Sequence, residues 1–455
     1  MVIVQTTFVT LGIMLAVILI WFAVIRRPIY EAIFVSFVVL VTINGRWGKV
    51  WDYFTTTLNT STLYSMTAFV LMSILLTKTG VIDGAIGIIL ALLGRVTGGA
   101  GYVAVAVSGF MGALSGSGPG NVMATGTITI PAMKKSGFPS ELAANIESVS
   151  SCLGNMIPPS STIVVACGLF QELHPELNLS IGQFWMVCWG CSIWFILLRF
   201  LMVFIFCKIY KVAPVPKEDI PKLRDVFREG WRGLLLPVII FIPFLLDYLF
   251  KSTFFTARLG ETGAKHMSSS ILFFVAGVVA IYTMFIVRDK KMVSPRAIAG
   301  YFSNGVKSIV PTIAVCFFGY MLGALFNDLD IGPGLQAGIA SLSLGKLGLC
   351  LVIPLLTAVL GIAIVGSSMV VLFGSVIIAL FTAVGVNPLL VAAMLPCICA
   401  VMSNMVPPIA PAFLAGVSLA NADFGKAAKN DIWWIVTQYI LEVIVLMGFL
   451  PVFGL

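Results

Sequence analysis

The stretch that decides the fold runs from residue 111 to residue 167 and reads MGALSGSGPGNVMATGTITIPAMKKSGFPSELAANIESVSSCLGNMIPPSSTIVVAC. It contains two breaks in an otherwise apolar sequence, SGSGPGN at residues 115–121 and GNMIPPS at residues 154–160. Glycine is unfavourable inside a helix, and proline removes a backbone donor and clashes with the preceding turn. Backbone groups freed in this way are tolerated at membrane depth only inside protein or beside a polar cavity. The two breaks therefore predict one buried binding site.

The second break recurs later in the chain. The motif NMxPP at residues 155–159 returns at residues 404–408, and 404 − 155 gives an offset of 249 residues. The same offset pairs Gly112 with Gly361 and places the first break opposite residues 364–370, IVGSSMV. We interpret this match of residue types and spacing as an internal duplication.

The composition is typical of a polytopic membrane protein. Hydrophobic residues make up 59% of the chain and charged residues 10%, and the mean hydropathy is +1.07. These values exclude a soluble domain. The net charge of +8 lies mostly in short loops, which indicates membrane orientation and no binding of nucleic acid. With two histidines and no cluster of His, Cys and Glu, we expect neither a transition-metal site nor an organic cofactor.

The order of apolar segments predicts an all-α fold of two repeats. Membrane spans are expected near residues 8–25, 31–44, 62–77, 181–207, 233–250, 269–287, 305–325 and 432–453, with short apolar runs at 81–94 and 332–343. Two re-entrant hairpins, at residues 98–133 and 347–384, are each followed by a broken span, at residues 139–170 and 388–419. Each half then crosses the membrane five times and has one hairpin. Because the number of crossings is odd, the second copy is inverted in the membrane relative to the first.

The predicted domain boundaries follow from this order. The first repeat covers residues 1–207, with scaffold-like helices and an interfacial arm in residues 1–80 and hairpin 1 with its broken helix in residues 81–170. A charged cytoplasmic linker occupies residues 208–232. The second repeat covers residues 233–455, with hairpin 2 and its broken helix at residues 347–419. The bias of Lys and Arg toward one side predicts that both termini are periplasmic.

The breaks predict a cation site in each repeat and an anion site between them. Helix C-termini present unpaired carbonyl oxygens that suit a small cation, and helices restarting after Asn121, Pro159, Ser368 and Pro408 present N-termini that suit an anion. We expect one Na⁺ per repeat, bound by residues from this set: Ser115, Gly116, Ser117, Asn121, Gly154, Asn155, Pro158, Gly366, Ser367, Ser368, Ser403, Asn404 and Pro407. The residues expected to bind the anionic solute are Ser117, Asn121, Ser160, Ser367 and Ser368.

Glu147 is a separate candidate. It lies about 12 Å into a helix that starts near Pro139, at ~1.5 Å per residue. An ionisable group at that depth is unfavourable unless it has a function, such as carrying a proton or sensing the nearby cation. The alternative is a carboxyl group that faces a watery cytoplasmic crevice or pairs with Lys134 or Lys135.

Four segments carry a resemblance to a known family: SGSG at residues 115–118, IPAMKKSG at 130–137, Ala143-Ala144, and IPPS at 157–160. Together they resemble the large membrane subunit of tripartite ATP-independent periplasmic (TRAP) transporters. The resemblance implies an elevator-type secondary transporter of the bacterial inner membrane, driven by Na⁺. It also implies a small four-helix membrane subunit, and a periplasmic binding protein that delivers a carboxylate or sulfonate solute.

Other functions remain open at this stage. Stand-alone carriers of the divalent-anion/Na⁺ symporter type share inverted hairpins, and Glu147 makes proton coupling a further alternative. A channel needs a continuous polar pathway, which hairpins closing from both faces argue against. An intramembrane enzyme needs a nucleophile with a base or a metal constellation, and the sequence shows neither, so we expect no enzymatic activity.

Overall fold

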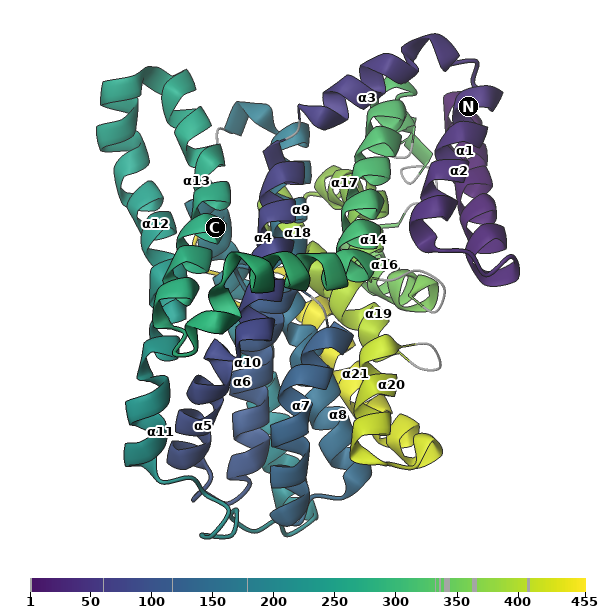
Figure 1. The fold of residues 1–455 in the computed structure, drawn as a ribbon. Helices are drawn as coiled ribbons and strands as arrows, with labels where there is room; N and C mark the ends of the chain where they lie inside the picture. Colours follow the sequence, from purple (N-terminus) through teal and green to yellow (C-terminus); the bar gives the residue numbers. More distant parts are fainter. Residues whose placement is uncertain are drawn as a thin grey trace.

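The computed structural model describes residues 2–59, 61–116, 118–177, 179–331, 333–334, 337–338, 344–361, 366–406 and 410–455. These residues form helices and no strands (Figure 1). The helices of the first half are α1 Val2–Leu19, α2 Ile29–Ile43, α3 Val50–Leu58, α4 Ser61–Thr79, α5 Val81–Leu93, α6 Gly99–Ser115, α7 Gly118–Lys135, α8 Ser140–Leu153, α9 Ser161–Leu173 and α10 Ile181–Ile209. The second half contains α11 Leu223–Gly230, α12 Leu236–Phe250, α13 Thr256–Ile286, α14 Pro295–Asp328, α16 Lys346–Leu360, α17 Gly366–Ala383, α18 Pro388–Leu395, α19 Met402–Met405, α20 Pro411–Ala420 and α21 Phe424–Met447. The chain is therefore an all-α polytopic membrane protein, as its composition predicts.

The two broken segments lie at the centre of the bundle. Within the described residues, five helical segments are long and apolar enough to cross a membrane. The apolar windows of residues 140–173 and 388–405 are 94% and 89% buried, whereas those of residues 181–210 and 424–447 are 50% and 33% buried. The first two segments are therefore surrounded by protein, and the last two expose a face to lipid.

Helices that correspond by the offset of 249 residues make corresponding contacts. Helix α7 packs on α20, and α17, which corresponds to α7, packs on α9, which corresponds to α20. The hairpin arms α6 and α7 pack on each other and on α8. The packing places both hairpins against the broken helices. The inversion of the halves across a membrane, and the repeat boundaries, stay predictions.

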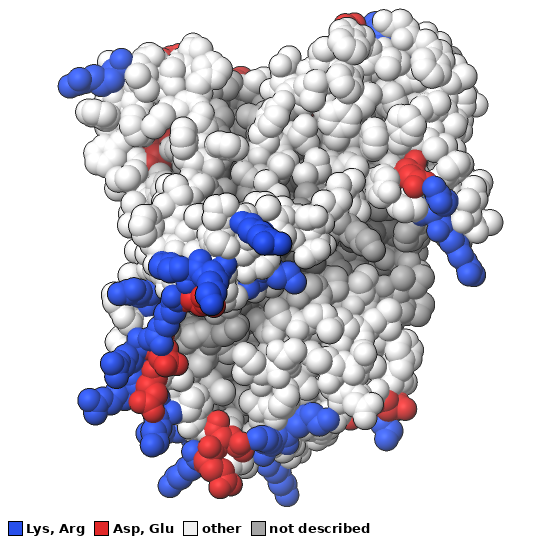
Figure 2. All heavy atoms as spheres, in the orientation of Figure 1, with Lys and Arg blue, Asp and Glu red and all other residues white. Residues whose placement is uncertain are grey.

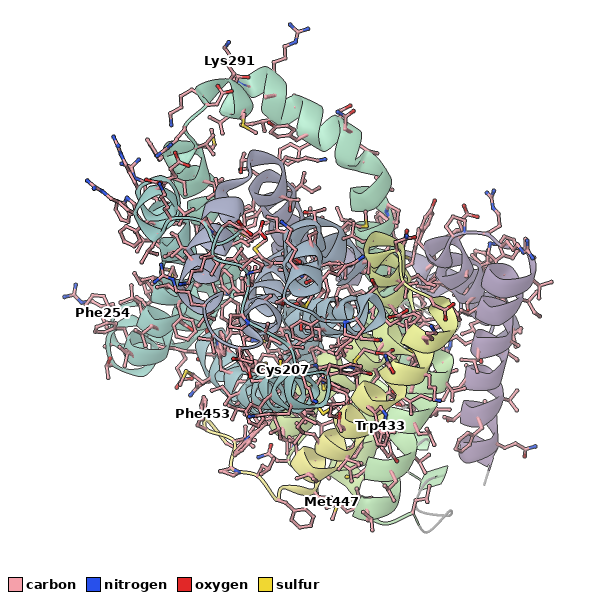
Figure 3. The ribbon with its side chains drawn as sticks, turned by 90° about the horizontal axis from the view of Figure 1, so that it is seen from below. Cys207, Phe254, Lys291, Trp433, Met447 and Phe453 are labelled. Atoms are coloured by element: carbon pink, nitrogen blue, oxygen red, sulfur yellow. The ribbon has the colours of Figure 1, made fainter. Side chains whose placement is uncertain are left out.

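Outside this core lie the N-terminal helices and α14. Helices α1 and α2 pack on each other at one side of the molecule, and α14 runs along the outside of the bundle from near Lys291 toward them (Figures 1 and 3). The predicted interfacial arm is α3, which Asp328 at the end of α14 fixes through Lys49 and a 3.0 Å hydrogen bond from the Tyr53 hydroxyl. The hydrogen bond from Lys49 lowers the pKa of Asp328.

Several predicted helix boundaries need correction. Helix α13 begins at Thr256 and not near residue 269, and it is interrupted by a kink at Gly260. The span predicted at residues 305–325 is part of the longer α14, because Ser294 accepts a hydrogen bond from the Ala297 backbone N–H and Pro295 occupies the first turn. Helix α21 begins at Phe424, not near residue 432, because Asp423 caps it by accepting from the Lys426 backbone N–H at 2.8 Å. It ends before Gly448, whose φ of 80° is left-handed. The predicted apolar run at 332–343 lies largely outside the described residues.

The basic side chains gather at one end of the molecule. Figure 2 shows most Lys and Arg in its lower half, where Figure 1 places α11 and the ends of α5 and α7. By the positive-inside rule that end is the expected cytoplasmic face, and the orientation stays a prediction.

Candidate ion and solute site at the helix breaks

The first break is shorter than the sequence predicts. Helix α6 ends at Ser115, and Gly116 closes it in a left-handed conformation with φ 61°, its N–H donating to the Gly112 carbonyl at 2.9 Å. Ser117 lies outside the described residues. Helix α7 begins at Gly118, because Pro119 is tolerated in a first turn, where its missing donor would be unpaired anyway. The prediction that this helix restarts after Asn121 is therefore wrong, and Asn121 belongs to its first turn.

The broken helix of the first half matches its prediction. Helix α8 ends at Leu153, a 3₁₀ turn covers Gly154–Met156, and the chain is extended at Ile157 before α9 begins at Ser161. Asn155 is 3% exposed and its backbone carbonyl accepts a hydrogen bond from the Thr162 hydroxyl. Ser160 is buried and its hydroxyl lies 2.7 Å from that of Thr162. The second break is thus a buried turn lined by hydroxyl and carbonyl oxygens, and Pro158 lies in it.

Hairpin 1 presses on this turn through glycines. A Cβ added to Gly154 would lie 2.2 Å from the backbone carbon of Gly112, and one added to Gly112 would lie 2.5 Å from the Ser151 carbonyl oxygen. A Cβ on Gly116 would lie 2.4 Å from the Ser161 hydroxyl oxygen. Only glycine allows the two backbones to approach so closely. These glycines therefore hold the end of α6 against the start of α9.

The second half repeats this contact with a different local structure. A π-helical segment, Pro396–Val401, and α19 separate α18 from the break, and Asn404 donates from its side chain to the Ala400 carbonyl at 2.7 Å. A Cβ on Gly361 would lie 2.4 Å from Cβ of Ser403, and one on Gly366 would lie 2.3 Å from the Ser403 hydroxyl oxygen. Gly361 and Ser403 are the residues that the offset of 249 pairs with Gly112 and Gly154.

Of the other predicted site residues of the second half, Ser368 is placed differently than predicted and the rest are only partly described. Helix α17 begins at Gly366, so the prediction that it restarts after Ser368 is wrong, and the buried Ser368 lies in its first turn. Pro407 lies outside the described residues, and the side chains of Ser115 and Ser367 are not among those described.

The broken helices of the two halves contact each other near their breaks. The 3₁₀ turn at Gly154–Met156 contacts the π-helical segment of the second half. A Cβ added to Gly118, at the tip of hairpin 1, would lie 3.8 Å from the amide carbon of Asn404 and 3.5 Å from the Cys152 sulfur. Candidates from both halves therefore lie side by side in the bundle centre.

Glu147 lies in a separate buried cluster, which we call the Glu147 cluster. Its side chain is 0% exposed and accepts hydrogen bonds from four hydroxyls, those of Ser108 at 2.8 Å, Thr125 at 2.5 Å, Ser151 at 3.2 Å, and Thr129. Asn121 belongs to the cluster too.

The amide nitrogen of Asn121 donates to the Ser108 carbonyl at 2.7 Å and to the Ser151 hydroxyl at 2.8 Å. Neither alternative for Glu147 holds in this structure: its side chain is 0% exposed, so it does not face a watery crevice, and it pairs with neither Lys134 nor Lys135. Lys134 donates to the Ala420 carbonyl at 3.0 Å, and Lys135 pairs with Asp219.

Sequence reasoning missed a second buried polar cluster, which we call the Arg199 cluster. It consists of Asn145, Arg199, Cys397, Asp431, Gln438 and Glu442, and all of them are 0% exposed. Arg199 on α10 donates to the Gln438 side-chain oxygen at 2.6 Å, and Gln438 donates to Glu442 at 2.9 Å. Arg199 and Glu442 fall inside predicted spans, and charges at that depth were the signal that identified Glu147.

No group of three or more His, Cys, Asp or Glu that would hold a metal occurs among the described residues. Cys188 and Cys191, which are spaced as in a redox motif, are buried free thiols on α10. The carbonyl and hydroxyl oxygens of the breaks are hard ligands, and the assignment of Na⁺ to them stays a prediction.

Comparison with known proteins gives a family. A family model described as "Tripartite ATP-independent periplasmic transporter, DctM component" matches residues 8–453. The C4-dicarboxylate TRAP transporter large permease protein DctM of Vibrio cholerae is 23% identical over 404 residues, which cover 84% of this chain and 83% of that protein. DctM of Pseudomonas aeruginosa is 30% identical over 179 residues, 39% of this chain and 40% of that protein, so this match spans less than half of the relative. For DctM of Rhodobacter capsulatus, 29% identical, the match covers 49% of each chain.

Two solved structures share the fold. The YdaH transporter of Alcanivorax borkumensis is 17% identical with a TM-score of 0.62, covering 90% of this chain and 89% of that one. MtrF of Neisseria gonorrhoeae is 14% identical with a TM-score of 0.65, covering 88% and 83%. At these identities the likeness concerns the fold alone.

Proposed function

Because the chain belongs to the DctM component family of tripartite ATP-independent periplasmic transporters, we propose that it imports a small organic anion by Na⁺-coupled secondary transport. The observation that carries the proposal is the contact between the two breaks, at which each hairpin presses on a broken helix through glycine. Buried helix C-termini, which suit a cation, and buried helix N-termini, which suit an anion, then lie close together.

The proposed Na⁺ sites use oxygen atoms that carry no formal charge. In the first half these belong to Ser115, Gly116, Ser117, Gly154 and Asn155, beside Pro158. In the second half they belong to Gly366, Ser367, Ser368, Ser403 and Asn404, beside Pro407. Carbonyl and hydroxyl oxygens are hard ligands, so they replace water around Na⁺ without leaving a charge buried when the ion departs.

The proposed solute is a carboxylate or a sulfonate. The names of relatives in this family state C4-dicarboxylates, sialic acid and isethionate, all organic anions. An anion between the hairpin tips would meet the N-termini of α7, α9 and α17 together with Ser117, Ser160, Ser367 and Ser368. The amide nitrogen of Asn121 is engaged in the Glu147 cluster, so we leave Asn121 out of the solute site. Its buried Oδ1 has no hydrogen-bond partner and stays a proposed Na⁺ ligand.

The proposed assembly follows the family. We expect a periplasmic binding protein that delivers the solute, a small four-helix membrane subunit, and an elevator motion of the hairpins and broken helices in the bacterial inner membrane. One relative is a permease named DctMQ, which supports a partner of this kind. The inverted repeats, the periplasmic termini and the separate small subunit are parts of the same proposal. A stand-alone symporter-type carrier is the competing assembly.

A second candidate function is proton coupling through Glu147. It is favoured by the complete burial of a carboxyl group whose four side-chain partners are all neutral hydroxyls. Such a group can exchange a proton when the surrounding helices move, because no fixed cation holds it ionised.

The test is uptake into proteoliposomes that contain this chain, its small subunit and the cognate binding protein. C4-dicarboxylates, sialic acid and isethionate are offered separately, with an inward Na⁺ gradient, an inward proton gradient, or neither. The proposal expects uptake of one of these anions that requires Na⁺ and the binding protein. Uptake driven by the proton gradient alone would favour Glu147, and uptake without the binding protein would favour the stand-alone carrier.

A further inference from the structure

Asp431 and Asn145 form a buried pair away from the helix breaks. Asp431 lies on α21 and Asn145 on α8, and both side chains are 0% exposed. The amide nitrogen of Asn145 donates to Asp431 Oδ1 at 3.1 Å and to the Ala427 carbonyl at 3.2 Å. Trp433, two residues further along α21, is 63% exposed, as expected for the opposite face of the helix (Figure 3).

Each member of the pair has one oxygen without a hydrogen-bond partner. These atoms are Asp431 Oδ2 and Asn145 Oδ1, and both are buried. An ionised carboxylate and an amide oxygen are acceptors only, so two acceptors stand without a donor while Asp431 is ionised. Buried polar atoms normally have partners, and a pair of unpartnered acceptors on two residues that are already hydrogen-bonded needs an explanation.

One proton supplies the missing donor. A carboxylic acid and a carboxamide can exchange two hydrogen bonds, in which the amide N–H donates to one carboxyl oxygen and the acid O–H donates to the amide oxygen. The first of these bonds is present. A proton on Asp431 Oδ2 would complete the second and would also remove a buried negative charge.

The charges around the pair do not replace that proton. None of the ion pairs in the described part of the chain includes Asp431. Arg199 on α10 and Cys152 on α8 are near enough to interact with it electrostatically. The hydrogen bonds of Arg199 go to the Gln438 side-chain oxygen and the Met405 sulfur, and none of them reaches Asp431, although Arg199 Nε and Nη1 have no partner.

The other helices packed on α21 add no charge at Asp431. On α16, Lys346 bonds the Met447 carbonyl at the far end of α21, and α18 and α19 contain no titratable residue. The π-helical segment contributes Cys397, whose thiol donates to Glu442 at 3.2 Å, and Cys399, which also interacts with Glu442. On α8, Glu147 is held by hydroxyls of α6 and α7 and by Ser151.

We propose that Asp431 and Asn145 form a proton-binding site, separate from the helix breaks and from Glu147, and that α21 packs on α8 in this arrangement only while the proton is bound. The proton comes from water near the start of α21, since Asp431 lies about 10 Å from Phe424 at ~1.5 Å per residue. Its release at alkaline pH leaves a buried carboxylate beside Asn145, with one oxygen of each side chain lacking a donor, and weakens the packing.

The test is thermal unfolding of the full-length chain, purified in detergent, between pH 6 and pH 9 with and without Na⁺. The wild-type midpoint is expected to fall as the pH rises, with a limit of about tenfold in the unfolding equilibrium per pH unit for one proton. Asp431→Asn keeps both hydrogen bonds as an amide pair, so its midpoint should lose this part of the fall. The double exchange Asn145→Asp with Asp431→Asn restores one acid and one amide and should restore the fall.

The control is Glu147→Gln, which removes the buried carboxyl group of α8. This variant should keep the decrease of the unfolding midpoint that is due to Asp431 on α21. If Asp431→Asn falls with pH as steeply as wild type, or if Glu147→Gln abolishes the fall, the assignment is wrong. If the addition of Na⁺ at constant pH abolishes the decrease of the wild-type unfolding midpoint, the assignment is also wrong. Na⁺, and not a proton, would then be the ligand. If Asp431→Asn does not fold while the double exchange folds and shows the fall, the acid–amide pair is supported. Failure of both variants, with Asn145→Leu folding and keeping the wild-type fall, would overturn it.

Discussion

The contact between Gly112 and Gly154 offers the sharpest perturbation of the proposed cation site. A Cβ at position 154 would lie 2.2 Å from the Gly112 backbone carbon, whereas an ordinary contact begins at 3.4 Å, so α6 and the broken helix must separate by 3.4 − 2.2 = 1.2 Å. The neighbouring atoms are backbone, which has no rotamer to change. Overpacking of this kind costs about 1–3 kcal/mol. Since Gly116 is held at the start of α9 by the same packing, the proposed ligands of the first Na⁺ site separate as well.

We therefore expect Gly154→Ala to insert and fold but to need more Na⁺ for half-maximal uptake. A weakening of about 1–3 kcal/mol, the worth of a buried polar partner, corresponds to roughly 5- to 150-fold. The matched control is Gly109→Ala on α6, on the same helix face as Gly112. There the added Cβ would lie 3.6 Å from the Ile157 side chain, which is an ordinary contact. The assay is a Na⁺ series of solute uptake in proteoliposomes, normalised to the amount of inserted protein. Wild-type Na⁺ dependence in Gly154→Ala, or an equal loss in Gly109→Ala, would show that this glycine contact does not hold the first Na⁺ site together.

Three further predictions follow from the site and the topology. Asn155→Ala and Asn404→Ala should each raise the Na⁺ concentration for half-maximal uptake by roughly 5- to 150-fold, whereas Asn304→Ala, exposed on α14, should leave it unchanged. Glu147→Gln should abolish the dependence of uptake on a pH gradient while solute binding persists if Glu147 carries a proton, and an unchanged dependence would remove it from the mechanism. Single cysteines at the exposed Lys217 and Asn387, in a cysteine-free background, should react with impermeant reagents from opposite faces of the membrane, and labelling from one face would exclude the inverted arrangement.

The sequence predicted the helix breaks well, because glycine and proline act locally. The end of α8 at Leu153 and the start of α9 at Ser161 follow from residues within one turn of each boundary. The start of α7 was placed too late, because Pro119 was read as a helix breaker although a first turn tolerates it. The start of α17 was also placed too late, because Gly366 and two serines were read as part of the break although they form the first turn of the helix.

The polar clusters were beyond local reasoning. Glu147 was identified by its depth, but its partner Ser108 is 39 residues away and is brought to it only by the packing of α6 on α8. Arg199 and Gln438 are 239 residues apart and meet because α10 packs on α21. A charge inside an apolar segment indicates that a partner exists, but the tertiary packing decides which residue it is.

We propose that each half of the chain contributes one Na⁺ site, so the number of Na⁺ ions moved per solute should be measured. The measurement is the reversal of solute flux in proteoliposomes as the Na⁺ gradient is varied against a fixed solute gradient, with the membrane potential clamped. We predict that at least two Na⁺ ions move with each solute and that the same value is obtained at different proton gradients. A flux reversal that ignores the Na⁺ gradient and follows the proton gradient would contradict it.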